Sequence, residues 1–331
     1  MKHANIALFV PHEGCPHRCV FCDQRTISGQ TSRVTQEDID KAVDIAVNSP
    51  SFSPQDTEIA FFGGSFTAID RDYMLSLLKG ASKYVANGTV RGIRCSTRPD
   101  AIDDEILDIY TSFGGTTIEL GCQSMDDRVL EMNRRGHTAL DTENAAGLIK
   151  AHGVSLGVQM MTGMYGDSEE GTVKTAEKLI ALEPDCARIY PTIVLDNTAL
   201  GVLYKRGEYK AQTLEEAVPL CAKLLRMFEG KNINVIKLGL HASNEVGENA
   251  LAGAYHPAFR ELCESRIYLE NAQRLLSSKP AGEYVLAVNS REVSKATGQK
   301  KCNAAYLAQK GWLVRFAQDD NLQKYEIRIV D

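Results

Sequence analysis

The chain has 331 residues, of which 44% are hydrophobic and 24% are charged, a composition typical of soluble globular proteins. No stretch reaches the roughly 18 apolar residues of a membrane-spanning helix, and the N-terminal apolar run is too short for a signal peptide. We therefore expect a cytoplasmic protein without a membrane partner, whose nine cysteines stay reduced. The formal net charge of −6 gives no global argument for nucleic-acid binding.

Short apolar or β-branched segments alternate with helical patterns over the first 240 residues. The alternation predicts parallel strands joined by right-handed crossovers, and hence an α/β fold of the partial (β/α)6 barrel type. Between the strands, Asp70 is the predicted N-cap of one helix, and Thr213 and Glu216 form a capping box that starts another. The expected strands cover residues 5–10, 58–64, 91–97, 116–123, 154–163, 187–194 and 234–240.

The pattern changes after residue 240. Residues 256–276 predict one long amphipathic helix, and residues 284–331 predict a strand, a helix and a closing hairpin. This last part holds eight Lys or Arg against five Asp or Glu, so it is basic. We expect three regions: a barrel at 1–240, a helical extension capping it at 241–283, and a small basic βαββ element at 284–331.

The segment GCPHRCVFCDQ holds Cys15, Cys19 and Cys22 in a C-x3-C-x2-C pattern just after the first strand. In α/β barrels the loops after the strands build the active site. A structural zinc site would need a fourth ligand, His12 or His17, and three buried core thiols would not suit a loop rich in Pro, His and Arg. An iron–sulfur cluster held by three thiolates would leave one iron open to a small molecule, and we favour this interpretation.

The cysteine pattern, with Phe21 before the last cysteine, resembles that of the radical S-adenosylmethionine (SAM) superfamily. The resemblance implies that Cys15, Cys19 and Cys22 hold a [4Fe–4S] cluster whose fourth iron chelates SAM. It also implies that an electron from the cluster cleaves a C–S bond of SAM and releases a radical that abstracts hydrogen. An electron donor such as ferredoxin or flavodoxin would then be a partner.

Further segments at predicted strand ends follow the order of SAM contacts in this superfamily. In FFGGSFT, the resemblance implies that glycine backbone approaches the amino group of SAM, where a Cβ would obstruct it. Taken alone, each segment has a plainer explanation, such as a tight turn, a helix end or a core methionine. The implied cofactor-binding residues are Phe21, Gly63, Gly64, Ser65, Thr97, Arg98, Gln123, Arg135, Met161 and Gly163.

Within the superfamily, CPHRCVFCDQ, FFGGSFT, STRPD, ELGCQS and residues 188–209 most resemble the Elongator catalytic-subunit branch. The resemblance covers about residues 5–240. In that branch the radical domain works with a C-terminal acetyltransferase to modify the wobble uridine of tRNA. The residues after 240 show no acetyl-CoA phosphate-binding loop, so we expect an Elongator-like enzyme without the acetyltransferase domain.

Two groups of residues are candidate substrate contacts. His241, Tyr255 and His256 follow the last barrel strand, and Lys295, Lys300 and Lys301 surround a glycine in the basic element, where RNA phosphates would fit. Packing or a solvated helix end explains the same residues. No residue is assigned as the hydrogen donor to a substrate radical, although thiol or phenol groups at Cys122, Tyr190 and Cys263 are chemically capable.

The favoured hypothesis is a radical SAM enzyme that modifies a substrate, with a tRNA nucleoside as the first candidate. One alternative is a radical SAM enzyme that acts on a small molecule, similar to the oxygen-independent coproporphyrinogen oxidases. The other is a non-catalytic nucleic-acid-binding protein that carries a cluster or zinc. The last alternative gives no reason for the ordered polar strand ends.

Overall fold

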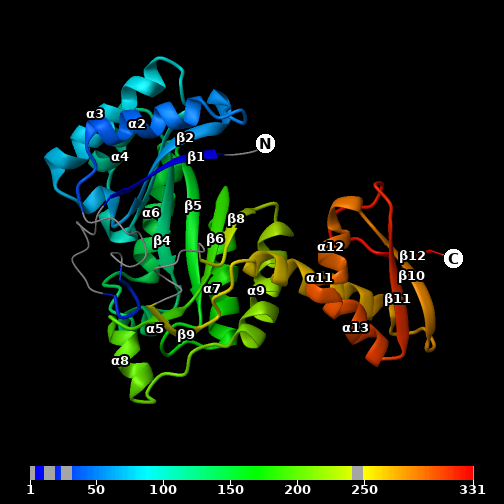
Figure 1. Cartoon of the computed structure of the whole chain (residues 1–331). Helices are drawn as coiled ribbons and strands as arrows, with labels where there is room; N and C mark the ends of the chain where they lie inside the picture. Colours follow the sequence, from blue (N-terminus) through cyan, green and yellow to red (C-terminus); the bar gives the residue numbers. More distant parts are fainter. Residues whose placement is uncertain (1–3, 11–18, 24–31, 241–248, 331) are drawn as a thin grey trace.

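The computed structural model describes residues 4–10, 19–23, 32–240 and 249–330. Its largest element is a seven-stranded sheet that curls into a half barrel (Figure 1), with the order β1-β2-β3-β4-β5-β6-β8 and parallel pairing throughout. Six of the seven predicted strands are confirmed within two residues at each end. The strands are β1 (Ala4–Val10), β2 (Thr57–Gly63), β3 (Gly92–Thr97), β4 (Gly115–Gln123), β5 (Ser155–Thr162), β6 (Cys186–Pro191) and β8 (Asn234–Leu238).

Helices follow the strands and cover the convex side of the sheet (Figure 1). Both predicted helix starts are confirmed: Asp70 accepts from the backbone N–H of Tyr73 at 3.0 Å, and Thr213 and Glu216 form a capping box. The helices of the barrel are α2 (Gln36–Val47), α3 (Arg71–Ala86), α4 (Asp104–Ser112), α5 (Asp127–Met132), α6 (Ala139–Ala151), α7 (Glu169–Ala181), α8 (Ala199–Lys205) and α9 (Leu214–Glu229).

The two faces of the curled sheet have different chemistry, because successive side chains of a strand point to opposite faces. On the convex face, Phe61, Leu120 and Ile189 are fully buried and belong to the main hydrophobic core beneath the helices. The alternate positions face the concave side. There the central strands carry charged and polar groups in place of the apolar layers that fill a closed barrel.

A chain of buried ion pairs crosses the concave face. Glu58 of β2 accepts from Arg94 of β3 at 2.8 Å, and Arg94 also donates to Glu119 of β4 at 2.7 Å. Arg188 of β6 donates to the same Glu119 through two of its nitrogens. Burial opposes ionisation of Glu58, but Arg94 and the neighbouring hydrogen-bond donors lower its pKa to about 2. The pairs therefore stay charged and hold four strands at a fixed spacing.

The segment predicted as one strand at 187–194 is two strands. β6 ends at Pro191, which has no N–H to continue the ladder, and Thr192 turns the chain by donating through its N–H and hydroxyl to the carbonyl of Thr162. β7 (Ile193–Leu195) then pairs antiparallel with β9 (Ala250–Gly253). The sequence pattern did not predict this second sheet.

The predicted closing hairpin of the C-terminal element is wrong. β10 (Gly282–Val288) lies between β11 (Trp312–Gln318), its parallel neighbour, and the short antiparallel β12 (Arg328–Val330). The helical crossover makes β10 and β11 parallel, so β12 takes the other edge of β10. The single predicted helix is also broken, into α12 (Val293–Thr297) and α13 (Cys302–Gln309).

The helix α11 (Phe259–Leu276) packs against α9 and leads from the barrel to the C-terminal sheet (Figure 1). On α11, the buried Glu264 pairs with Lys295 at 2.8 Å and with Lys324 at 3.0 Å. Glu229 of α9 also accepts from Lys324, at 2.9 Å. These shared carboxylates connect the C-terminal element to the barrel. No helix in the described part of the chain is long and apolar enough to cross a membrane.

Removing the guanidinium of Arg94 should destabilise the protein strongly, because it leaves Glu58 and Glu119 buried without their shared cation. We expect Arg94→Met to lower the free energy of unfolding by about 3–5 kcal/mol, measured by urea unfolding at pH 7. The matched control is Lys174→Met, which removes one partner of the exposed pair Lys174–Glu170 and should leave the unfolding midpoint unchanged. Equal effects of the two substitutions would contradict a structural role for the buried chain.

Candidate functional site

The loop after β1 carries two described cysteines, Cys19 and Cys22, whereas Cys15 lies outside the described residues. Val20 fixes this loop to the barrel. Its backbone N–H donates to the carbonyl of Asn133 at 3.2 Å, and its carbonyl accepts from Leu200 at 2.7 Å. Its side chain is 3% exposed and packs with Leu200, and Phe21 joins the same small apolar cluster. The thiols therefore lie beside α5 and α8, which follow strands β4 and β7.

Arg135 connects the cysteine loop to the end of β4. Its Nη1 donates to the sulfur of Cys19 at 3.2 Å, and its Nη2 donates to the carbonyl of Gly121 at 2.6 Å. Its own carbonyl accepts from Arg98, which follows β3. The family resemblance assigned Arg135 to SAM, but the sequence did not predict this contact with a cysteine sulfur. Only the folded chain brings the two residues together, since 116 positions separate them.

The glycine segment at the end of β2 is shaped by a close backbone approach. Gly63 has a φ of +114°, and a Cβ at this position would lie 2.3 Å from the carbonyl oxygen of Val10. A side chain here would therefore separate the ends of β1 and β2. Gly64 follows in the same turn. Position 63 therefore requires glycine because of the neighbouring backbone of β1, whereas the expected approach of SAM to this segment stays a prediction.

Hydroxyl groups join the glycine segment to the end of β3. Thr97 is hydrogen-bonded to Ser65 at 2.9 Å and to Thr67 at 2.6 Å, and the backbone N–H of Arg98 donates to Ser65 at 3.1 Å. Asp100 receives two hydrogen bonds from the Arg98 guanidinium, at 2.8 and 3.0 Å. Ser65 and Thr97 are buried, so their contacts orient the segment that carries Arg98.

Three polar atoms at these strand ends are buried without a hydrogen-bond partner among the described residues: Nη1 of Arg98, Nε of Arg135 and Oε1 of Gln123. Gln123 also has a φ of 65°, a left-handed conformation that is uncommon outside glycine. Buried polar groups normally have partners. Two unsatisfied donors and one acceptor beside a cysteine loop therefore fit a bound polar ligand such as SAM.

The remaining implied cofactor residues lie at the end of β5. Met161 pairs in register with Tyr190 of β6. Gly163 has a φ of +68°, and its carbonyl accepts from the hydroxyl of Tyr209 at 2.6 Å. The structure thus brings the described members of the predicted cofactor set to one end of the sheet, because parallel strands present their carboxyl ends together.

The substrate candidates do not form one group. Tyr255 packs with Ile193 and Leu195, and the imidazole of His256 accepts from the N–H of Ala258 at 3.1 Å. Lys295 forms ion pairs with Glu264 and Glu292, which is a structural role. Lys300 and Lys301 are exposed and both have positive φ. His241 lies outside the described residues.

Of the three hydrogen-donor candidates, two are inert core thiols. Burial raises the pKa of Cys122 to about 12 and also raises the pKa of Cys263. Tyr190 differs, because it lies on the concave face beside Arg188, whose Nη1 donates to its hydroxyl at 3.4 Å. The ion pairs of the concave face were not predicted from the sequence. The sequence feature that could have revealed these ion pairs is a charged residue within each of several otherwise apolar strands.

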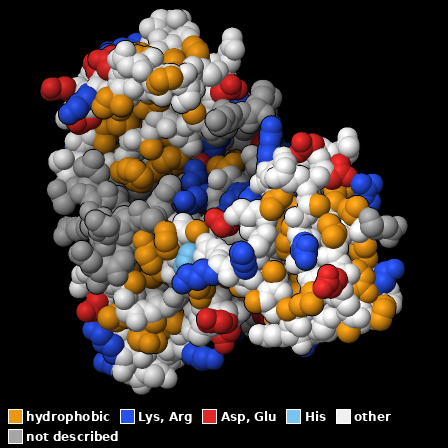
Figure 2. Space-filling view, turned by 45° about the vertical axis from the view of Figure 1, so that its right-hand side comes forward, with side chains coloured by type: hydrophobic (Ala, Val, Ile, Leu, Met, Phe, Trp, Pro, Cys, Tyr) orange, Lys and Arg blue, Asp and Glu red, His pale blue; other side chains and the backbone are white. Residues whose placement is uncertain are grey.

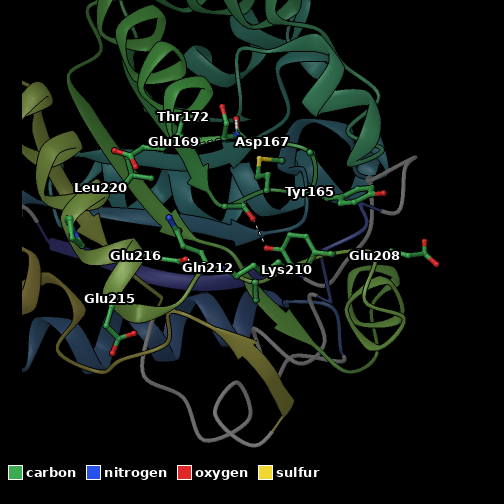
Figure 3. Close-up of a pocket in the computed structure, with 17 residues that line it drawn as sticks. Tyr165, Asp167, Glu169, Thr172, Glu208, Lys210, Gln212, Glu215, Glu216 and Leu220 are labelled. Carbon is green, nitrogen blue, oxygen red and sulfur yellow. Dashed lines mark hydrogen bonds and ion pairs between the residues drawn. The ribbon is translucent and has the colours of Figure 1, made fainter.

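A cavity of about 720 Å³ lies at the end of β5, where Gly163 is part of its lining, between the start of α7 and the segment before α9 (Figure 3). Its lining includes Asp167, Glu169, Glu208, Glu215 and Glu216, with Lys210 as the one basic residue among those that line it. Burial raises the pKa of Asp167. The cavity is acidic, so it does not suit the phosphates of a nucleic acid.

A family model described as "Radical SAM superfamily" matches residues 9–179, and a second, "Radical_SAM C-terminal domain", matches residues 184–269. The chain belongs to the radical SAM superfamily. This membership makes it an enzyme and agrees with the site at the strand ends. It also implies a [4Fe–4S] cluster and SAM, for which the three cysteines and the unsatisfied polar atoms are suitable partners.

The relatives point to the Elongator-like branch of this superfamily. The chain is 28% identical over 256 residues to the tRNA uridine(34) acetyltransferase of Methanocaldococcus jannaschii, covering 66% of this chain and 47% of that protein. It is 28% identical over 190 residues to human Elongator complex protein 3, covering 51% and 35%. The chain thus spans about half the length of the first of these two proteins and less of the second. The archaeal Elp3 of Methanocaldococcus infernus has a similar fold, with a TM-score of 0.62 at 20% identity, covering 82% of this chain and 64% of that one.

The buried His137 should make this radical SAM fold sensitive to mild acid. Burial, and then the charge of Arg135, lower its pKa to about 4, below the value of about 6.5 in an unfolded chain. The unfolded state therefore binds a proton first as the pH falls. We expect the free energy of unfolding to decrease between about pH 6.5 and pH 4, and His137→Gln to flatten this dependence in urea titrations. An unchanged pH slope in the variant would contradict the assignment, and its stability at pH 7.5 reports any loss of packing separately.

Proposed function

We propose that this protein is a radical SAM enzyme that reductively cleaves SAM to modify a nucleoside of tRNA. The observation that supports this most directly is the set of contacts around Arg135, which joins a cluster cysteine to the ends of β3 and β4. Three unsatisfied polar atoms lie at these ends. This is the end of a parallel sheet where ligands bind.

In this proposal Cys15, Cys19 and Cys22 bind a [4Fe–4S] cluster through their sulfurs. The cluster with SAM supplies one-electron reductive cleavage of a C–S bond. The chain supplies orientation: Arg98 and Arg135 offer N–H donors suited to a carboxylate, and Gln123 offers an acceptor suited to an amino or hydroxyl group. An external donor such as ferredoxin or flavodoxin would provide the electron.

The choice of tRNA as substrate rests on relatives and on charge. Several relatives are named as tRNA uridine(34) acetyltransferases. The chain spans only part of these proteins, so their acetyltransfer is not part of the proposal. The exposed Lys300 and Lys301 remain candidate phosphate contacts in the C-terminal element. A cytoplasmic location is consistent with a tRNA substrate.

The first test is SAM cleavage by the anaerobically reconstituted protein with dithionite as reductant. We expect 5′-deoxyadenosine, measured by chromatography, and we expect its formation to increase several-fold with bulk tRNA. Cys19→Ala should abolish the product, because three thiolates are required to hold the cluster. Cys302→Ala is the matched control: it removes an exposed thiol outside the barrel and should leave product formation unchanged.

The outcomes separate the two parts of the proposal. Cleavage that does not respond to tRNA would retain the SAM chemistry and direct the search to small molecules. No cleavage by protein with an intact cluster, shown by its absorption and EPR spectra, would refute the enzymatic proposal.

Arg135 should also tune the cluster, because its guanidinium lies 3.2 Å from the sulfur of Cys19. Reduction adds negative charge to a cluster, and a nearby hydrogen-bonded cation stabilises that charge. We expect Arg135→Gln to shift the reduction potential by tens of millivolts to more negative values in an EPR-monitored titration, and Arg135→Lys to shift it less. Arg134→Gln, which changes the exposed neighbour, is the control, and an equal shift in that variant would contradict a direct contact.

A further inference from the structure

Two aromatic rings lie on the concave side of the first two strands. Phe9 of β1 is paired in register with Phe62 of β2, and their ring centres are 6.3 Å apart at an interplanar angle of 48°. Their chain neighbours Leu8 and Phe61 point to the convex side and are buried in the main core. The two rings are only partly buried, and neither packs against a hydrophobic cluster of the described residues. We call Phe9 and Phe62 the aromatic pair.

The curl of the sheet brings polar side chains of β5 and β6 to the aromatic pair. The guanidinium of Arg188 lies 5.0 Å from the centre of the Phe62 ring, although three strands separate β2 from β6 in the sheet. Gln159 of β5 is the register neighbour of Arg188. Tyr190 is the next inward residue of β6, roughly 7 Å closer to the strand ends. Figure 2 shows Lys and Arg side chains (blue) around the hollow near the middle of the molecule.

The carboxamide of Gln159 is oriented by the neighbouring strands. Its Nε2 donates to the hydroxyl of Ser96 at 3.1 Å and to the carboxylate of Glu119 at 3.5 Å. Gly121, its register neighbour on β4, has no side chain to block this reach across to β3. An ionised Glu119 can only accept hydrogen bonds, so the amide nitrogen must lie on this side. Oε1 of Gln159 accepts from no described residue and remains as an acceptor.

Arg188 and Tyr190 add donors on the adjacent strand. Arg188 donates to Glu119 through Nε and Nη2, and its Nη1 donates to the hydroxyl of Tyr190 at 3.4 Å. The guanidinium still has N–H groups left over, and the Tyr190 hydroxyl has its own O–H to donate. Glu119 holds Arg188 in one orientation, so a ligand that binds to it costs little conformational entropy. The concave face thus offers one acceptor and two donor groups beside two aromatic rings.

We propose that this part of the concave face binds the base of the substrate nucleoside and selects a pyrimidine. The inference rests on the proposed function and deepens it. The ring of the base would stack on the aromatic pair, as unpaired RNA bases do on aromatic side chains. Its edge would donate to Gln159 and accept from Arg188 and Tyr190. Uracil and cytosine each present two acceptors and one donor along that edge, which complements this set, whereas guanine and adenine do not.

The direct test is equilibrium dialysis of uridine, cytidine, adenosine and guanosine against the reconstituted protein, with saturating SAM and no reductant. We expect the pyrimidine nucleosides to bind several-fold more tightly than the purine nucleosides. Tyr190→Phe and Gln159→Met should each weaken pyrimidine binding about fivefold, as for the loss of one hydrogen bond, and reduce the preference. Tyr306→Phe, which removes an exposed hydroxyl of the C-terminal element, is the control and should bind as the wild type.

Phe9→Leu tests the stacking separately. Stacking on an aromatic ring tolerates every base, so this variant should weaken the binding of all four nucleosides about tenfold and leave the preference unchanged. Phe9→Tyr retains an aromatic ring and should bind as the wild type.

Each outcome decides the inference. No binding of any nucleoside, equal affinities for all four, or wild-type affinities in Tyr190→Phe and Gln159→Met would overturn it. Nucleoside binding that saturating SAM abolishes would assign these residues to the SAM site and would overturn it as well.

A second measurement separates this inference from the proposed function. If tRNA stimulates SAM cleavage, Gln159→Met should raise the tRNA concentration for half-maximal stimulation about fivefold, and an unchanged value would overturn the base pocket while the function stands. If tRNA does not stimulate cleavage but the nucleosides bind with the expected preference, the proposed function fails. The pocket then stands for a free nucleoside or nucleotide.

Discussion

The carboxylate of Glu119 organises the concave side of this molecule. It lies on the central strand of the sheet, is 1% exposed, and accepts from Arg94 on one side and Arg188 on the other. An ionised carboxylate in this position is stable only with partners, so it fixes both guanidiniums. Gly157 on the next strand makes room for it, since a Cβ there would lie 2.8 Å from the Glu119 side chain. The site at the strand ends is built on this rigid base.

Buried ion pairs rarely add much stability relative to apolar packing, and their value here is in specificity. A concave face lined with Leu and Val would collapse on itself or attract apolar ligands, as the interior of a closed barrel does. A charged face remains available to polar ligands, and its strands cannot slip in register without separating charge pairs. The same residues thus keep the concave face polar, which favours polar over apolar ligands there.

The sequence predicted the strands well because their apolar segments are short and bounded by glycine and polar residues. Asp70 and Thr213 were predictable as caps because the rule that governs them is local. Three features were not predictable. The break at Pro191 could be predicted only with β9 known as the partner of β7. The place of β10 between β11 and β12 depends on tertiary pairing. The contact of Arg135 with Cys19 joins residues that are distant in the sequence.

The candidate site was likewise predictable from the sequence only in part. A motif predicted the cysteines and Gly63 as site residues, but the motif did not distinguish residues that face a ligand from residues that hold the site together. Thr97 and Ser65 are buried in a hydroxyl network, and Lys295 is bound to Glu264 and Glu292. Their neighbours Arg98 and Lys301 have groups free or exposed for other partners. Residue type alone could not separate these cases, because each side chain is polar and only burial and pairing decide its role.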